Sequence, residues 1–252
     1  MGAGDVADGV PAPAASLLFA AGERPDTAGV AALSRVGSAF SISHEPSGQG
    51  EGPRWLELLA NGLTFDLVGL AGGDPAPLPA SGHLAGLPAG LDGAGLRAIT
   101  LRPGHHLAAG GRMPPVLKAL ASLAAQLTAL PGVQAVAWHP ARCWSQPERF
   151  RETVNAWLAG GVFPAFCLAA LATAPDGGMH SEGMAQFIGQ ELRMEPELVG
   201  DRAEAAKLAV RLLHWLYEHG PIEVAERIPT PNGDSVRLEP SANRRFVRAW
   251  RG

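Results

Sequence analysis

The chain has 252 residues, a formal net charge of −4, 46% hydrophobic residues and 17% charged residues. This apolar content can fill a substantial core, which excludes a globally disordered protein. The small net charge excludes a surface that as a whole attracts nucleic acid or anionic membranes. No run approaches the ~18 apolar residues that span a bilayer, and the first residues lack the basic start of a secretory signal. We therefore expect a cytoplasmic protein without a membrane span.

The first elements along the chain are a short strand and a helix. Residues 1–14 are rich in glycine, proline and alanine without periodicity, so we expect a disordered leader. Residues 16–20 form a short apolar run that is typical of a buried strand, and Asp26 can cap a helix over residues 27–36.

A hairpin and a connector come next. Asn61-Gly62 readily adopts the two positive φ values of a type I′ turn, so residues 55–60 and 63–70 are predicted to pair as antiparallel strands. Proline and glycine dominate residues 72–95, which predicts an irregular connector between two halves of the fold.

The rest of the chain mixes strands and helices without a regular βαβα order. Two helices have caps in the sequence, because Ser145 with Glu148 forms a capping box and Asp201 precedes the last helix. The predicted order is a strand at 96–101, a helix from Pro114 or Pro115 to Leu130, a strand at 133–138, a helix at 146–159, an interior strand at 163–173, a partner strand at 179–192 that contains a bulge or a short helical stretch, the helix after Asp201, and a closing hairpin of 222–228 with 235–238.

This order indicates an α+β fold with a largely antiparallel sheet and helices packed on one face. We expect a single domain over residues 15–242, with halves at about 15–71 and 96–242 joined by the connector 72–95, followed by a basic tail at 243–252. Two fused ferredoxin-like halves are one arrangement that fits this order.

Common motifs for nucleotides, zinc proteases and hydrolases are absent from the sequence, so no cofactor is predicted. His105 and His106 are weak metal candidates just past a predicted strand, where side chains can converge on an ion. Adjacent residues of an extended chain point in opposite directions, however, and no third ligand follows at a metal-binding spacing. An exposed loop is the alternative. Cys143 and Cys167 are expected to be buried thiols.

Four residues are candidates for catalysis, namely His139, His180, Glu182 and Glu191. His139 lies between a strand end and a helix start, where backbone N–H groups are available to a ligand. His180 and Glu182 share a face of a regular strand, so the carboxylate could orient the imidazole for acid–base chemistry. Glu191 would share a face with Arg193. Ordinary salt bridges or edge-strand charges are the alternative.

The hydrophobic patterns of core-forming helices and strands are clear in this sequence. Its groups of potentially reactive side chains, in contrast, match catalytic or metal-binding arrangements only weakly. The sequence therefore favours a non-catalytic protein-binding or regulatory module, which would bind a protein partner or a second copy through a sheet face or edge. A small-molecule or metal-dependent enzyme with a His/Glu site is the first alternative. Nucleic-acid contact through the arginine-rich tail is the second, set against a tail that packs its aromatic residues and solvates its charges. The tail residues concerned are Arg244, Arg245, Arg248 and Arg251, with Phe246 and Trp250 between them.

Three strings of the second half carry a resemblance to a known family. They are Val133-Gln-Ala-Val-Ala-Trp138, Gly161-Val-Phe-Pro164 and Ser181-Glu-Gly-Met-Ala-Gln-Phe-Ile-Gly-Gln-Glu-Leu192. With the order of segments from Leu96 to Leu238, they resemble the bacterial family called domain of unknown function 4261. The resemblance covers about half to two-thirds of the chain, and it implies an intracellular α+β domain without an established activity or catalytic residues.

Overall fold

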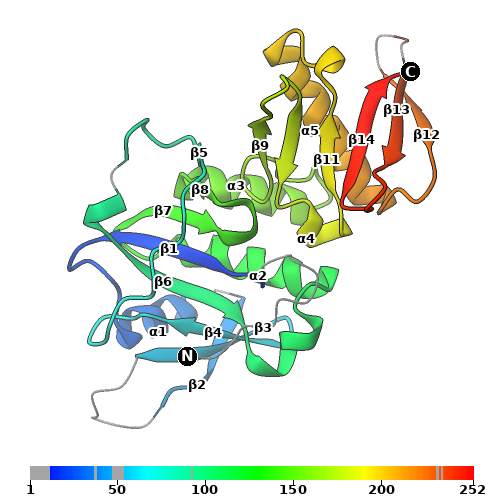
Figure 1. The fold of residues 1–252 in the computed structure, drawn as a ribbon. Helices are drawn as coiled ribbons and strands as arrows, with labels where there is room; N and C mark the ends of the chain where they lie inside the picture. Colours follow the sequence, from blue (N-terminus) through cyan, green and yellow to red (C-terminus); the bar gives the residue numbers. More distant parts are fainter. Residues whose placement is uncertain (1–11, 37–38, 47–53, 92, 231–232, 234) are drawn as a thin grey trace. The chain divides into compact units, whose positions relative to one another are not determined.

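The computed structural model describes residues 12–36, 39–46, 54–91, 93–230, 233 and 235–252 (Figure 1). The chain divides into two compact units, Met1–Gly161 and Val162–Gly252. Each unit combines helices with a mostly antiparallel sheet, so the predicted α+β class is confirmed. Most of the expected leader over residues 1–14 lies outside the described residues. Among the helices that the structure describes, none has the length and apolar character needed to cross a membrane.

The first unit is built on an eight-stranded sheet with the order β2-β3-β4-β6-β1-β7-β8-β5. Its strands are antiparallel to their neighbours apart from β5 and β8, which run parallel. In chain order the strands are β1 (Ala15–Ala20), β2 (Phe40–His44), β3 (Trp55–Ala60), β4 (Leu63–Val68), β5 (His83–Ala85), β6 (Leu96–Pro103), β7 (Val133–Trp138) and β8 (Cys143–Ser145).

The hairpin of β3 and β4 is confirmed. The two strands are antiparallel, with Trp55 opposite Val68 and Ala60 opposite Leu63. Asn61 has a φ of 52° and Gly62 a φ of 76°, as a type I′ turn requires. The turn therefore sets the register that was predicted from its two residues.

The α-helices of the described part of this unit are α1 (Thr27–Arg35), α2 (Pro114–Leu127) and α3 (Pro147–Leu158). Asp26 caps α1 as predicted, since its Oδ1 accepts a hydrogen bond from the Gly29 N–H at 2.8 Å. Helix α2 packs against β1, β4 and β6, and α3 packs against β7 and α2. The apolar side of α2 is buried, with Leu117, Leu120 and Leu123 fully covered. Short 3-10 turns are η1 (Gly93–Gly95), η2 (His105–Gly110) and η3 (His139–Ala141).

The capping box at Ser145 was predicted wrongly. Ser145 is the last residue of β8, where it lies opposite both Val136 and Ala85, and its side chain is fully buried. These ladder partners hold the serine in the sheet, so Gln146 becomes the N-cap of α3 without a side-chain hydrogen bond. Pro147 occupies the first helical turn, where its missing N–H costs nothing.

Residues 72–95 differ from the irregular connector that their composition predicts. They contain β5 and η1, and Ala76 forms a bridge with Ala98 of β6. Ala76 belongs to a core cluster with Leu18 and Trp144, against which Leu87 and Leu91 also pack. The segment thus covers one face of the sheet, because alternation leaves that face of β1 and β6 apolar.

The boundary between the compact units lies at Gly161 and Val162, not in this segment. Strand β6 follows the Pro/Gly-rich segment directly, yet it is hydrogen-bonded between β4 and β1. The sheet therefore joins residues on both sides of the segment into one unit, and the expected halves at 15–71 and 96–242 do not match the division that the structure has.

The second unit is built on a six-stranded sheet with the order β12-β13-β14-β11-β10-β9. Strands β11 and β14 run parallel, and the other neighbours are antiparallel. The elements are β9 (Ala170–Thr173), β10 (Met179–Glu182), α4 (Ala185–Ile188), β11 (Glu191–Met194), η4 (Pro196–Leu198), α5 (Arg202–His219), β12 (Glu226–Pro229), β13 (Ser235–Pro240) and β14 (Phe246–Arg251).

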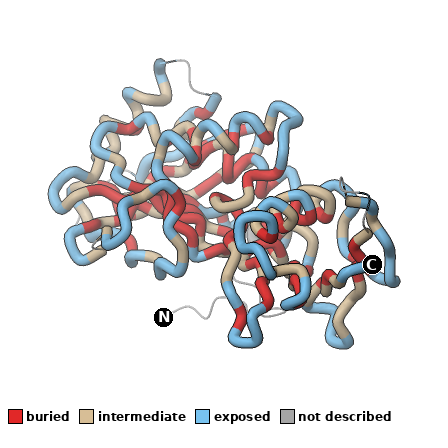
Figure 2. The backbone as a smooth tube through the Cα atoms, turned by 90° about the horizontal axis from the view of Figure 1, so that it is seen from above, coloured by how far each residue is buried: buried red, intermediate tan, exposed pale blue. Residues whose placement is uncertain are grey.

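Helix α5 lies along one face of this sheet (Figure 1). Asp201 caps it as predicted, accepting from the N–H groups of Ala203 and Glu204 at 2.8 and 3.2 Å. The buried face of the sheet includes Leu192 and Val247. Figure 2 shows that buried residues, drawn in red, gather along the strands and that exposed residues, drawn in pale blue, lie in many of the connections.

Residues 163–192 and the C-terminal strand of this unit agree only in part with the predictions. The helical stretch inside residues 179–192 is confirmed as α4. The interior strand at 163–173 is wrong, because only residues 170–173 form a strand and this strand, β9, is at the edge of the sheet. Phe166 interrupts the expected strand with a φ of 70°. The basic tail is also wrong as a tail, because β14 is paired on both sides, with β13 and β11.

Candidate functional site

The predicted catalytic residues fall in different units. His139 belongs to the first unit, while His180, Glu182 and Glu191 belong to the second.

His139 takes part in a chain of hydrogen bonds across the first sheet. Its Nε2 lies 2.8 Å from the Ser16 Oγ, which lies 2.7 Å from the Thr100 Oγ1. Burial lowers the pKa of His139 to about 4, so the imidazole is neutral at physiological pH. A hydroxyl beside a neutral imidazole is a nucleophile–base pair in hydrolases. Ser16 is fully buried in the central strand β1, however, so the arrangement serves the sheet and not an incoming substrate.

The Glu191 carboxylate connects the start of β11 to the first residues of α4 through hydrogen bonds. One carboxylate oxygen accepts from the N–H groups of Gly183 and Ala185 at 2.8 and 3.0 Å. The other accepts from the Ser181 hydroxyl at 2.5 Å and from the Met184 N–H at 3.1 Å. Burial raises the pKa of Glu191, and the four donors oppose that shift because each favours the charged form. With both oxygens occupied in this way, the geometry favours a structural role.

His180 and Glu182 share a face of β10 as predicted, and the His180 Nε2 lies 3.9 Å from the Glu182 Oε1. This distance is that of a loose ion pair, too long for a hydrogen bond that would fix an imidazole. Across the strand pair His180 lies opposite Arg193, whose guanidinium contacts Asp176 and lies 3.8 Å from the Glu195 Oε1. The surroundings of His180 are thus a set of ion pairs on the sheet.

His105 and His106 lie on the 3-10 turn η2 and are exposed. Their ring centroids are 4.0 Å apart, which corrects the expectation that an extended chain would point them in opposite directions. Among the described residues no group of three His, Cys, Asp or Glu side chains is arranged to hold a metal ion. The pair therefore lacks the further ligands of a closed metal site.

The arginines of β14 are engaged within the protein. The Arg248 Nε donates to the buried Glu195 Oε1 at 2.7 Å, and its guanidinium lies 4.3 Å from the ring centroid of Trp250. The Arg251 backbone N–H donates to the Glu197 Oε1 at 2.6 Å. The ion pair with Glu195 neutralises the charge of Arg248, which weighs against a phosphate contact by that side chain.

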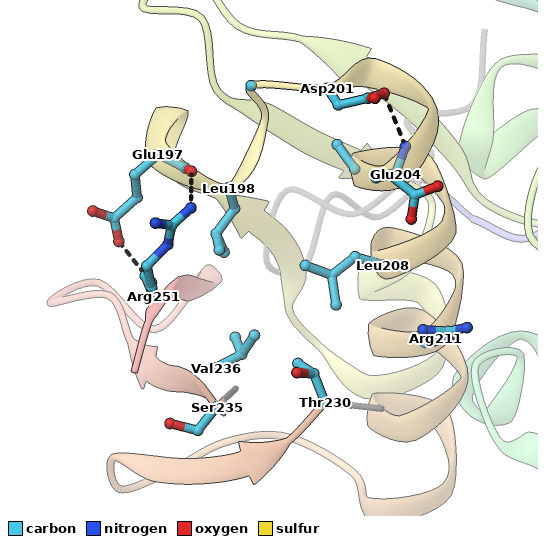
Figure 3. Close-up of a pocket in the computed structure, with 12 residues that line it drawn as sticks. Glu197, Leu198, Asp201, Glu204, Leu208, Arg211, Thr230, Ser235, Val236 and Arg251 are labelled. Atoms are coloured by element: carbon cyan, nitrogen blue, oxygen red, sulfur yellow. Dashed lines mark hydrogen bonds between the residues drawn. The ribbon is translucent and has the colours of Figure 1, made fainter. Parts of the chain in front are cut away.

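A pocket of about 280 Å³ lies in the second unit, and Figure 3 shows it in close-up. We call it the η4–α5 pocket. It is lined by η4, the first half of α5 and the strands around the closing hairpin. Its apolar residues are Leu198, Ala205, Leu208 and Val236, and its polar residues are Glu197, Asp201, Glu204, Arg211, Thr230, Ser235 and Arg251, with Gly200 at the turn before α5.

The pocket has an apolar floor between two charged rims. In Figure 3 the side chains of Leu198, Leu208 and Val236 point toward the space between η4 and α5. Arg251 lies on the η4 side and Arg211 on the α5 side. Polar residues outnumber apolar ones in the lining, so a ligand would meet apolar atoms at the floor and charged groups around it. The pocket contains none of the four predicted catalytic residues.

Few features of the sequence indicate this pocket. Arg211 falls on the face of α5 that helical spacing marks as solvated, and it is indeed exposed. Leu208 is one turn before Arg211 on the same side, but a single apolar residue beside a polar face is common. Glu197 and Arg251 are 54 residues apart and meet only because β14 enters the sheet beside β11.

Comparison of the chain with models of protein families, with curated proteins and with solved structures gave no match.

Proposed function

We propose that the second unit is a non-catalytic protein-binding module whose site is the η4–α5 pocket. The observation that carries this proposal is an apolar floor of Leu198, Leu208 and Val236 set between charged rims. Protein interfaces concentrate their binding energy where one apolar or aromatic side chain of a partner fills a desolvated pocket inside a polar rim. We call such a partner side chain the anchor.

The size of the pocket suits one anchor. Its volume of about 280 Å³ lies just below the roughly 300–1,000 Å³ of pockets that hold drug-sized ligands. Val236 and Ala205 are almost fully buried, while Leu198 and Leu208 are half-buried, so an entering side chain would cover the exposed parts of two leucines. Burying apolar surface at about 25 cal/mol per Å² then favours binding.

The enzyme alternative has less support. The Glu191 carboxylate accepts four hydrogen bonds, and Ser16 beside His139 is fully buried. A general acid or base must lie within reach of substrate atoms, and these groups are occupied within the fold. His180 and Glu182 remain the pair that a substrate could approach most easily, since both are partly exposed.

The test is selection of peptides from a random displayed library against the full chain. We expect enriched peptides to share an apolar residue, and we expect Leu208→Gln to weaken their binding by at least about 30-fold, as for a hot spot of 2 kcal/mol. Val224→Gln is the matched control, because Val224 is an exposed apolar residue of the same unit outside the pocket. Leu198→Gln repeats the test if Leu208→Gln does not fold. Peptides that bind both pocket variants as well as the original chain would rule the site out.

Two further expectations belong to this proposal. A cytoplasmic location fits Cys143 and Cys167, which are buried in the apolar core. Membership of the domain of unknown function 4261 family, suggested by the string around Glu191, stays a prediction. Cell fractionation tests the first, and a solved structure of a family member with the β10–α4–β11 arrangement would test the second.

A further inference from the structure

We propose that the protein forms a symmetric dimer in which β9 pairs with β9 of a second copy, antiparallel and about a two-fold axis at Ala172. Strand β9 is at one edge of the second sheet, and none of its residues lines the η4–α5 pocket. The dimer contact and the pocket are therefore separate surfaces, and each can be tested without the other. The pairing would join the six-stranded sheets of two copies into one continuous sheet.

Strand β9 has free backbone groups along its outer edge, and β10 is its neighbour on the other side (Figure 1). The Ala174 N–H donates to the Gly178 carbonyl at 2.8 Å, so these two residues are a hydrogen-bonded pair of the antiparallel ladder. Such pairs alternate along a strand, which leaves Leu171 and Thr173 with their N–H and C=O groups pointing outward. Within the described residues, none of these four groups makes a hydrogen bond. Leu171 is partly exposed and Thr173 is exposed, so a second strand can reach both.

The other edges of the two described sheets carry features that discourage the addition of a strand. Strand β12 contains Glu226, Arg227 and Pro229. Strand β2 has an irregular register between Ile42 and His44, and β5 is three residues long. Strand β9 has the sequence Ala-Leu-Ala-Thr, with neither a charge nor a proline, and it pairs regularly with β10 over all four residues. This edge therefore lacks the protection that the others have.

The free part of the edge is two outward-pointing residues long. On one side, Pro175 has no N–H to donate. On the other side, the Ala169 carbonyl already accepts from the Phe166 N–H at 2.6 Å. A partner strand therefore finds complete pairs of donor and acceptor at two residues, Leu171 and Thr173.

The same edge of a second copy complements this pattern. With a two-fold axis at Ala172, Leu171 of each copy lies opposite Thr173 of the other, and four N–H groups meet four C=O groups. At the axis the two Ala172 residues form a non-hydrogen-bonded pair, whose Cα atoms approach to about 4.5 Å, and methyl side chains fit such a close pair. An axis at Leu171 or Thr173 would instead bring the occupied Ala169 carbonyl or Pro175 into the pairing.

The experiment is analytical ultracentrifugation of the full chain from micromolar to millimolar concentration, where we expect a monomer–dimer equilibrium. Leu171→Pro removes an outward N–H from each copy, and so two of the four hydrogen bonds, without removing a bond between β9 and β10. The dimer should weaken by at least about 10-fold. Arg227→Pro is the matched control on β12 and should leave the dimer unchanged. Its N–H also points outward, because the bond from the Gly252 N–H to the Ser235 carbonyl sets the alternation across β13.

A cross-link tests the register and does not depend on the folding of Leu171→Pro. Ala172→Cys places two thiols opposite each other at the axis, where the Cα separation of about 4.5 Å suits a disulfide. Oxidised glutathione should therefore convert this variant to a covalent dimer, and Arg227→Cys should stay monomeric on a non-reducing gel. A monomer at every concentration, a dimer that Leu171→Pro leaves unchanged, or a dimer that Ala172→Cys does not cross-link would each overturn the proposal.

Discussion

Replacing Glu191 by alanine tests the structural role that the contacts assign to this carboxylate. The substitution leaves four donors without their acceptor, namely the Ser181 hydroxyl and the backbone N–H groups of Gly183, Met184 and Ala185. A buried donor that loses its partner costs about 1–3 kcal/mol. Glu191 is partly exposed, so water can replace some of these bonds, and we expect the second unit to lose about 3 kcal/mol of unfolding free energy.

The assay is thermal unfolding of the full chain, with hydrogen exchange of peptides from residues 163–252 reporting on the second unit. A loss of about 3 kcal/mol lowers the melting temperature of a domain of this size by roughly 10–20 °C. The matched control is Glu182→Ala, because Glu182 is partly exposed and makes a looser contact with His180 at 3.9 Å. An effect of Glu191→Ala below about 0.5 kcal/mol, or one no larger than the control, would refute the reasoning.

The pH dependence of this effect has a definite sign. Burial raises the folded-state pKa of Glu191 above its ordinary value of 4.5, so the folded state binds the proton more tightly than the unfolded state does. The associated stability is fully present below pH 4.5 and is lost as the pH rises through the raised pKa. The deficit of Glu191→Ala should therefore be larger at pH 4 than at pH 8.

Three further predictions concern other parts of the fold. The pKa of His139 is lowered from 6.5 to about 4, so the first unit should keep its full stability above pH 6.5 and lose roughly 3 kcal/mol as the pH falls to about 4. His139→Gln should flatten this part of the profile in urea unfolding, and an unchanged profile would contradict the assignment. Arg248→Gln should cost about 1–2 kcal/mol in calorimetry because the buried Glu195 loses its 2.7 Å donor, whereas Arg245→Gln should change stability by less than about 0.5 kcal/mol. Gly62→Ala should cost about 1 kcal/mol in urea unfolding, because a Cβ meets no atom within 4 Å and the φ of 76° alone disfavours alanine; an unchanged midpoint would show that the turn relaxes.

Local signals in the sequence predicted local structure well. Asn61-Gly62 fixed the first hairpin, and Asp26 and Asp201 marked the helix starts, because each acts through backbone groups within a few residues. The capping box at Ser145 was predicted wrongly because the local signal was not decisive there. The serine side chain suits an N-cap, but strand pairing with Val136 and Ala85 holds its backbone in the sheet.

The two segments whose structure was predicted wrongly from composition are placed by contacts with residues far away in the sequence. The Pro/Gly-rich residues 72–95 looked like a linker by composition, yet Leu87 and Leu91 pack on the core of the first unit. The arginine-rich end looked like a tail, yet the buried Val247 and Ala249 alternate with Arg248 and Trp250 along a strand that is paired on both sides. Alternation was visible in the sequence, whereas the parallel pairing of β14 with β11 was not.

The candidate site was harder to predict than the fold. The sequence drew attention to His180, Glu182 and Glu191, whose residue types are typical of catalysis. The pocket instead combines ordinary residues from η4, α5 and β14, and no local pattern shows that Arg211 and Arg251 line the same pocket. Sites assembled from surface residues of separate elements leave no spacing that can be recognised along the chain.

The most direct test of the account is an NMR structure determination of the full chain with a selected peptide, using intermolecular distances to methyl groups. The account predicts close contacts between the anchor of the peptide and the methyl groups of Leu198, Leu208 and Val236. Contacts at the β9 edge or around His180 and Glu182, with none at these methyl groups, would contradict it.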